Sequence, residues 1–205
     1  NSLLLCGQVA LTSGKLSEAE KWYTDSLFKA KNLQMPLQQG LALEGLGFLA
    51  YQQGRVGKSC ELLAYACELL SLYPAERLRV SLKLAAAIRK SGDMVGTLKR
   101  LEEAEKDADT LAKNAKTKNI AGLMRFAILA EQGHTFLQMG IFNKAQEYLT
   151  KAFEFEKSNP MISEVNRMNL EGNKLVADGE IGETLAAINQ LKKFLNLTRL
   201  RIFLR

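Results

Sequence analysis

The sequence predicts an all-α fold in which about five antiparallel helix pairs follow one another as an array. Leu, Ala, Lys and Glu dominate the composition, Pro is limited to three residues, and no stretch shows the alternating apolar pattern of a strand. Of the 205 residues, 47% are hydrophobic, which is enough to bury a sizeable core. A glycine between two apolar helical stretches recurs at intervals of 40, 38, 48 and 39 residues, as Gly14, Gly54, Gly92, Gly140 and Gly179.

Small residues hold fixed positions relative to these turn glycines. Seven residues before each glycine stands Gly7, Gly47, Ala85, Gly133 or Gly172. Five residues after each glycine stands Ala19, Ser59, Thr97, Ala145 or Thr184. Because a small side chain lets a neighbouring helix come close, we expect the two helices of each pair to pack tightly at these positions.

This register resembles that of the tetratricopeptide repeat (TPR) family, and the resemblance covers nearly the whole chain. The stretches "LALEGLGFLAYQQGRVGKSCELLAYACEL" and "LAEQGHTFLQMGIFNKAQEYLTKAFEF" match it best. The resemblance implies a right-handed superhelical array, a TPR-like α-solenoid, whose first helices line a concave groove. The period of about 40 residues exceeds the usual 34. Lengthened repeats of this kind resemble those of kinesin light chains, spindle-orientation adaptors and the arms of bacterial regulators.

Glycine and proline residues also predict where the helices begin and end. The expected helices are 2–12, 16–33, 36–52, 56–72, 75–90, 94–117, 119–138, 142–157, 161–177 and 181–196. They are expected to form one array over residues 1–205, with units near 1–34, 35–73, 74–118, 119–159 and 160–197, and with 198–205 as a tail or the start of a further helix. Ser17 and Asp93 are expected to mark helix starts. The long second helix of the third unit is interpreted as solvated, with a docking ridge as the alternative.

The residues predict no enzyme activity, no cofactor and no metal site. The chain has a single histidine, His134, and lacks phosphate-loop, nucleophile-elbow and zinc motifs. Cys6, Cys60 and Cys67 lack disulfide or metal spacing, so we expect buried structural thiols in an intracellular protein, either cytoplasmic or nuclear. No apolar run reaches the ~20 residues of a membrane span.

The formal net charge is +6, but the basic residues form no continuous run. Residues 77–90 carry several of them on one expected helix, where apolar residues interrupt the series. A nucleic-acid surface usually concentrates Lys and Arg along one path, so this pattern disfavours a nucleic-acid partner and favours an acidic peptide.

The predicted function is a non-catalytic protein–protein interaction scaffold or adaptor segment, part of a larger protein or complex, that binds a peptide or helical segment of a partner in its concave groove. The alternative is a sensory or regulatory arm of a signal-transduction ATPase or transcription regulator. Carried over from the TPR register, the inward-facing residues differ from unit to unit, which favours recognition of an irregular peptide over a merely solvated helix face. The predicted partner-binding residues are Glu44, Phe48, Tyr51, Arg79, Arg89, His134, Gln138, Asn166, Asn169 and Asn173.

Two features near the C-terminal end of the sequence lead to further hypotheses. The three asparagines lie on one helix face, where each carboxamide could hydrogen-bond a bound peptide backbone, or where the stripe is simply solvated. The final stretch "LKKFLNLTRLRIFLR" carries more apolar residues than a closing helix needs. It is interpreted as the start of a further unit or as a docking segment, including self-association through this tail.

Overall fold

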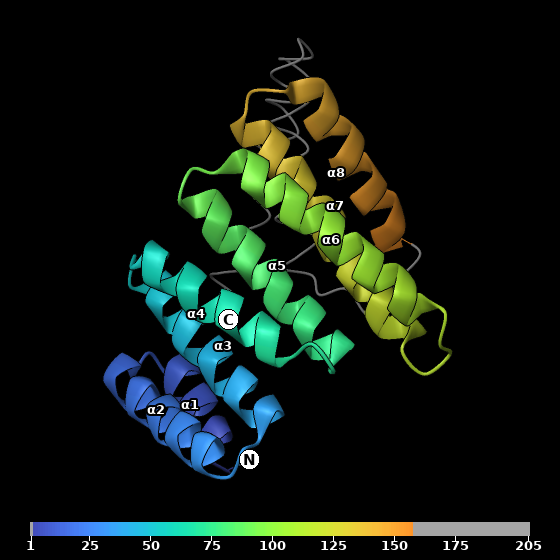
Figure 1. Ribbon diagram of the computed structural model, residues 1–205. Coiled ribbons are helices and arrows are strands. Elements are labelled where there is room, and N and C mark those ends of the chain that lie inside the picture. The colour runs from blue at the N-terminus through green and yellow to red at the C-terminus, as the bar shows by residue number, and fades with distance from the viewer. Residues whose placement is uncertain (1, 158–205) are drawn as a thin grey trace, which may run out of the picture. The chain divides into compact units, whose positions relative to one another are not determined.

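The computed structural model describes residues 2–157, and this part of the chain consists of α-helices joined by short turns (Figure 1). The helices are α1 (Ser2–Thr12), α2 (Leu16–Asn32), α3 (Pro36–Gln52), α4 (Val56–Leu69), α5 (Pro74–Lys90), α6 (Met94–Ala112), α7 (Lys118–Gln138) and α8 (Phe142–Lys157). Residues 2–157 contain no strand. The predicted all-α fold is therefore confirmed. The helices expected at 161–177 and 181–196 lie outside the described residues, as does the tail.

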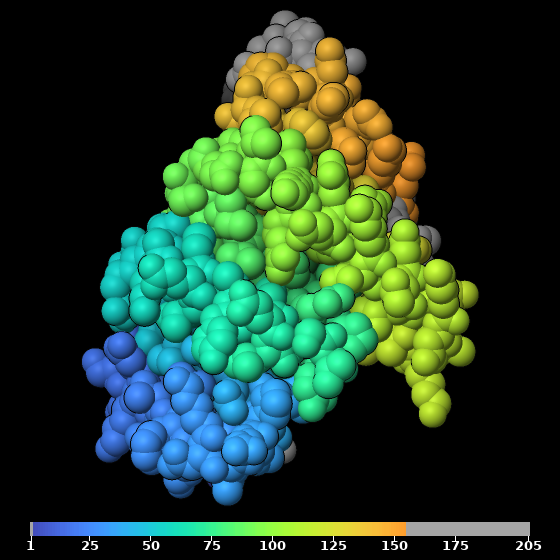
Figure 2. Space-filling model, in the orientation of Figure 1, coloured from blue at the N-terminus to red at the C-terminus, as the bar shows by residue number. Residues whose placement is uncertain are grey.

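The chain divides after Ala121 into two compact units. The first unit holds α1 to α6, and the second begins at Gly122 within α7 and includes α8. Within the first unit each helix packs on the next one along the chain, and α1 also contacts α3, as α3 contacts α5. In the space-filling view, the residues of this unit follow one another from blue to green in adjoining layers (Figure 2). The first helices of successive pairs therefore share one surface.

Glycine forms the turn inside each described pair because the backbone there is left-handed. Gly14, Gly54, Gly92 and Gly140 have φ values of 73°, 74°, 93° and 71°. A side chain in this region clashes with the backbone, so glycine is the favoured residue at such a helix end. The predicted turns at these four glycines are confirmed, and their physical cause is backbone conformation. The fifth predicted turn glycine, Gly179, lies outside the described residues.

Replacing Gly54 by Ala should lower the free energy of unfolding by about 1 to 2 kcal/mol, the usual cost of a left-handed L-residue. A Cβ at this position meets no atom within 4 Å, so strain of the backbone is the sole expected cause. Gly57→Ala is the matched control, because Gly57 lies in α4 with equally open space but without a positive φ. Urea denaturation of both variants tests this, and equal midpoints would contradict the account.

The small residues bring the paired helices close together. A Cβ added to Gly47 of α3 would lie 2.7 Å from Cγ of Leu63 in α4, and one added to Gly133 of α7 would lie 2.6 Å from Cγ of Leu149 in α8. The hydroxyl of Ser59 donates a 2.8 Å hydrogen bond to the Gly47 carbonyl oxygen. The predicted close packing therefore exists in both pairs.

Two predicted helix ends and one predicted start signal are wrong, and the other predicted bounds of the described helices agree to within one residue. The helix expected to reach residue 72 ends at Leu69, and the one expected to reach 117 ends at Ala112. In the second case, Asn114 Oδ1 accepts the Lys116 N–H at 3.0 Å, and this local bond competes with continued helix. At the starts, Asp93 caps α6 by accepting the Gly96 N–H at 2.7 Å, as expected. Ser17, in contrast, lies inside α2, which begins at Leu16.

The expectation of buried thiols is correct for Cys67 and wrong for Cys6. Cys67 packs in the core between α4 and α5, where burial raises the pKa of its thiol. Cys60 is half-buried, and burial raises the pKa of its thiol too. Cys6 is exposed on α1. No helix precedes α1 among the described residues, so the side of α1 that carries Cys6 has no neighbour there.

Candidate functional site

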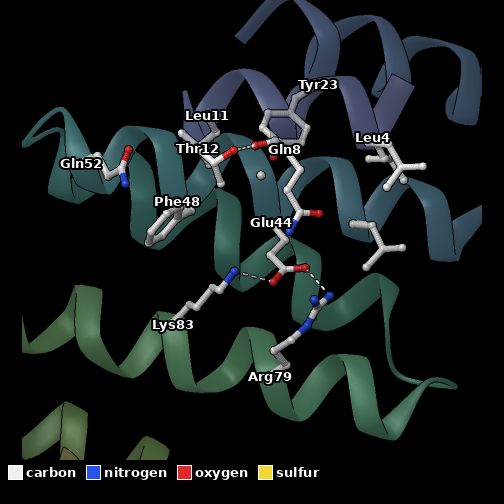
Figure 3. Close-up of a pocket in the computed structure, with 13 residues that line it drawn as sticks. Leu4, Gln8, Leu11, Thr12, Tyr23, Glu44, Phe48, Gln52, Arg79 and Lys83 are labelled. Carbon is white, nitrogen blue, oxygen red and sulfur yellow. Dashed lines mark hydrogen bonds and ion pairs between the residues drawn. The ribbon is translucent and has the colours of Figure 1, made fainter. Parts of the chain in front are cut away.

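A hollow of about 540 Å³ lies in the first unit, on the surface that α1, α3 and α5 share (Figure 3). Its lining combines leucine side chains, two aromatic rings, three uncharged polar side chains and three charged ones. The lining side chains are those of Leu4, Leu5, Gln8, Leu11, Thr12, Tyr23, Leu41, Glu44, Phe48, Gln52, Arg79 and Lys83, with Gly45 completing the set. We call it the α1/α3/α5 hollow.

A buried carboxylate lies between two cations in this hollow. Glu44 Oε2 lies 2.6 Å from Nη2 of Arg79, and Glu44 Oε1 lies 2.7 Å from Nζ of Lys83. The Glu44 side chain is 6% exposed, whereas those of Arg79 and Lys83 are 46% and 36% exposed. Figure 3 shows the Glu44 carboxylate between the ends of the other two side chains. The cluster therefore carries a net positive charge and presents mainly its cations to solvent.

Two aromatic rings continue the surface along α3. Phe48 and Tyr51 stack with their ring centroids 6.4 Å apart and their planes 8° apart. Lys83 Nζ lies 5.0 Å from the centroid of the Phe48 ring, and Lys90 Nζ lies 4.3 Å from that of Tyr51. Each lysine of α5 is thus held over a ring of α3 by a cation–π contact. The wall of the hollow is both apolar and positively charged.

The other side of the hollow is apolar and comes from α1 and α2. Leu4 and Leu11 of α1 pack around Tyr23 of α2, which is 5% exposed. Burial, reinforced by the Glu44 carboxylate, raises the pKa of the Tyr23 phenol, so the ring remains neutral. Tyr23 fits there because Gly7 of α1 carries no Cβ, which would otherwise lie 2.7 Å from the ring. The packing of the repeat therefore also shapes the hollow.

The predicted site residues fall into three groups. Glu44, Phe48 and Arg79 line the hollow, Tyr51 stacks on Phe48, and Arg89 lies half-buried further along α5. His134 is half-buried and Gln138 exposed, both on α7 in the second unit. The remaining predicted residues, Asn166, Asn169 and Asn173, lie outside the described residues.

Lys83 lines the hollow but was not among the predicted binding residues. Lys83 lies four residues after Arg79, a spacing that places both on one side of a helix, and this signal could have identified it. Arg79 was expected to meet carboxylates of a partner, whereas in the structure it already pairs with Glu44. The leucines of α1 and α3 were also absent from the predicted binding residues, although Leu4, Leu5, Leu11 and Leu41 line the hollow.

The lining residues are suited to binding by contact and charge. Thr12 carries a hydroxyl that donates to the carbonyl oxygens of Gln8 and Val9 within its own helix.

No group of three or more His, Cys, Asp or Glu side chains that could hold a metal ion occurs among the residues described. The helices of the described segment also include none that is long and apolar enough to cross a membrane.

A second hollow of about 410 Å³ lies between α4, α5 and α6. Arg77 pairs there with Asp107 at 2.6 Å, and Arg100 pairs with Glu103 at 2.9 Å. The Nε atoms of both arginines are buried away from the surface. This hollow has no aromatic side chain in its lining, so the α1/α3/α5 hollow is the stronger candidate for binding a protein segment.

Comparison with solved structures identifies the class of fold. The structure of BtubC (BKLC) from P. vanneervenii matches with a TM-score of 0.74 and 14% sequence identity, over 94% of this chain and 78% of that one. TPR-like repeats assigned to a kinesin light chain of P. anserina match with a TM-score of 0.69 and 16% identity, over 96% of this chain and 95% of that one. A variant form of these repeats gives a TM-score of 0.70 at 16% identity, over 97% of this chain and 95% of that one.

The protein therefore has the TPR-like α-solenoid fold that its repeats predict. No protein-family model matches the chain, and no curated protein matches its sequence.

Proposed function

We propose that this protein is a non-catalytic interaction module that binds a segment of a partner protein in the α1/α3/α5 hollow, as a scaffold or adaptor within a larger assembly. One observation carries the proposal. Partly exposed apolar rings and leucines adjoin two cations whose shared counter-ion, Glu44, is buried beneath them. This arrangement offers a partner both apolar contact and a positive potential at a single place.

The chemistry of the hollow defines the segment that fits it. A bulky apolar side chain gains by leaving water among Leu4, Leu11 and Phe48. A carboxylate beside it meets the exposed sides of Arg79 and Lys83, which retain one positive charge after pairing with Glu44. The proposed ligand is therefore an acidic segment with a large apolar residue. The apolar contact supplies most of the affinity, and the charges favour the correct partner and speed its approach.

Replacing Phe48 by Ala should weaken binding by about 10- to 100-fold, the effect of removing an anchoring side chain worth ~1–3 kcal/mol. Peptides are first selected from a random display library on the immobilised full chain, and their affinities are then measured by fluorescence polarisation. Tyr65→Ala is the matched control, because Tyr65 is a partly exposed aromatic residue of α4 outside the hollow.

The library experiment can also contradict the proposal. We expect enrichment of acidic peptides with a bulky apolar residue, and we expect their affinities to fall as the salt concentration is raised and screens the cations. Equal loss of affinity in the Phe48 and Tyr65 variants, or no loss in either, would place binding elsewhere on the molecule.

A further inference from the structure

Lys90, the last residue of α5, is a cation without a carboxylate partner beside the hollow. Its Nζ lies 4.3 Å from the centroid of the Tyr51 ring and donates a 3.3 Å hydrogen bond to the Tyr51 carbonyl oxygen. Among the described residues it pairs with no Asp or Glu, whereas Arg79 and Lys83 share Glu44. The exposed Lys90 side chain is therefore held in place, and no counter-ion neutralises its charge.

The repeat places Lys90 at the edge of the hollow. Thr12, Gln52 and Lys90 each stand two residues before a turn glycine, in α1, α3 and α5 respectively. Thr12 and Gln52 line the hollow, and α3 contacts both α1 and α5. Equivalent positions on first helices that pack side by side follow one another across their shared surface. Lys90 therefore continues this polar end of the hollow by one helix.

The helix itself sets the distance between the two lysines of α5. Lys90 comes seven residues after Lys83, which places both on one side of α5 and about 10 Å apart along its axis. Each lysine lies over one ring of the stacked pair formed by Phe48 and Tyr51. The surface thus presents two cationic positions at a fixed separation, both supported by aromatic rings of α3.

We propose that Lys90 and Tyr51 form a second subsite, here called the Lys90 subsite, which binds a second acidic side chain of the partner segment. This side chain lies about 10 Å from the carboxylate that meets Arg79 and Lys83, as the rise of α5 requires. The inference rests on the proposed function of the hollow and adds a required spacing of charges to it. A ligand with one acidic residue leaves Lys90 unpaired, so the subsite selects among acidic segments.

The uncharged polar side chains of the hollow favour an extended ligand. Gln8 and Gln52 line the hollow with exposed side chains (Figure 3), and neither carboxamide is hydrogen-bonded to another described residue. A carboxamide both donates and accepts, so it can bond the peptide groups of an extended segment, whereas those of a helix already bond each other. A length of about 10 Å corresponds to roughly three residues of extended chain. The proposed ligand therefore carries two acidic residues about three positions apart.

Double-mutant cycles on a library-selected peptide test the Lys90 subsite. Each acidic residue of the peptide is replaced in turn by its amide, and affinities for the original full chain, for Lys90→Met and for Lys83→Met are measured by fluorescence polarisation at low salt. Lys90→Met should weaken binding about two- to fivefold, the usual effect of one exposed ion pair. One acidic residue should lose its effect in Lys90→Met, and a different one, about three positions away, should lose its effect in Lys83→Met.

Two control variants separate binding from structure. Lys90→Arg should keep the affinity, because it keeps the charge. Lys99→Met, which removes an exposed lysine of α6 outside the hollow, should leave the affinity unchanged. Because Lys90 also bonds the last turn of α3, the unfolding midpoint of each variant is measured as well.

The results that would overturn the Lys90 subsite differ from those that would overturn the hollow. The subsite is wrong if Lys90→Met leaves the affinity unchanged, whatever its unfolding midpoint, or if no acidic residue couples to Lys90. It is also wrong if the same acidic residue couples to both lysines. In each of these cases a loss of affinity in Phe48→Ala would still support binding in the hollow. If no peptide is enriched, the proposed function fails and the subsite fails with it.

Discussion

Gly47→Leu should lower the free energy of unfolding by about 3 kcal/mol or more, at the upper end of the usual cost of overpacking. Even a Cβ at this position would lie 2.7 Å from Cγ and 2.9 Å from Cδ2 of Leu63, which is 1% exposed and packs in the core cluster of α4 and α5. Moving α4 away would also break the 2.8 Å hydrogen bond from Ser59 to the Gly47 carbonyl oxygen. Denaturant unfolding followed by circular dichroism measures the loss.

Gly57→Leu is the control for the effect of a leucine as such. A Cβ at Gly57 meets nothing within 4 Å, and leucine is a better helix former than glycine, so this variant should be as stable as the original protein or slightly more stable. If Gly47→Leu unfolds at the same denaturant concentration as Gly57→Leu, then the close packing of α3 on α4 does not stabilise the fold.

Removal of both cations from Glu44 should have the second large effect. In the double variant Arg79→Met and Lys83→Met, the Glu44 carboxylate, which is 6% exposed in the protein, loses both partners. A buried charge without a partner destabilises a protein by roughly 3–5 kcal/mol, and we expect about 2 to 3 kcal/mol here because both cations are partly exposed. Thermal and urea unfolding of the purified variant measure this cost.

Glu44→Gln should be much less destabilising than that double variant. The amide keeps the shape of the side chain, and the two cations it leaves behind reach solvent. Adding Glu44→Gln to the double variant should therefore recover part of the lost stability, because no buried charge remains. If the effects of the three substitutions on the free energy of unfolding are instead additive, the carboxylate and the two cations do not act as one cluster.

The helices and turns could be predicted from the sequence because their causes are local. A left-handed turn favours glycine, and close helix packing requires a small residue. Turn glycines such as Gly54 and packing glycines such as Gly47 therefore recur at fixed positions in the repeats. The end of α6 could not be predicted from periodicity. The residues around Asn114 favour continued helix, but the Asn114 side chain accepts the Lys116 N–H and so competes with the helical hydrogen bonds.

The candidate site could be predicted only in part because its contacts join helices that lie far apart in the sequence. Sequence reasoning placed Glu44, Phe48 and Arg79 on inward faces, and all three line the hollow. The sequence could not predict that Arg79 and Lys83 both pair with the Glu44 carboxylate, because that depends on how α5 is rotated against α3. Cys6 was expected to be buried because the three cysteines lack disulfide or metal spacing, whereas burial requires a neighbouring helix.

The central claim, that a partner segment binds in the α1/α3/α5 hollow, is tested most directly by photocrosslinking. A benzoylphenylalanine residue replaces Phe48 in one sample of the full chain and Tyr65 in another, and each sample is irradiated with a library-selected peptide. The account predicts a crosslink from position 48 that unlabelled peptide competes away, and none from position 65. A crosslink from position 65 with none from position 48 would contradict it.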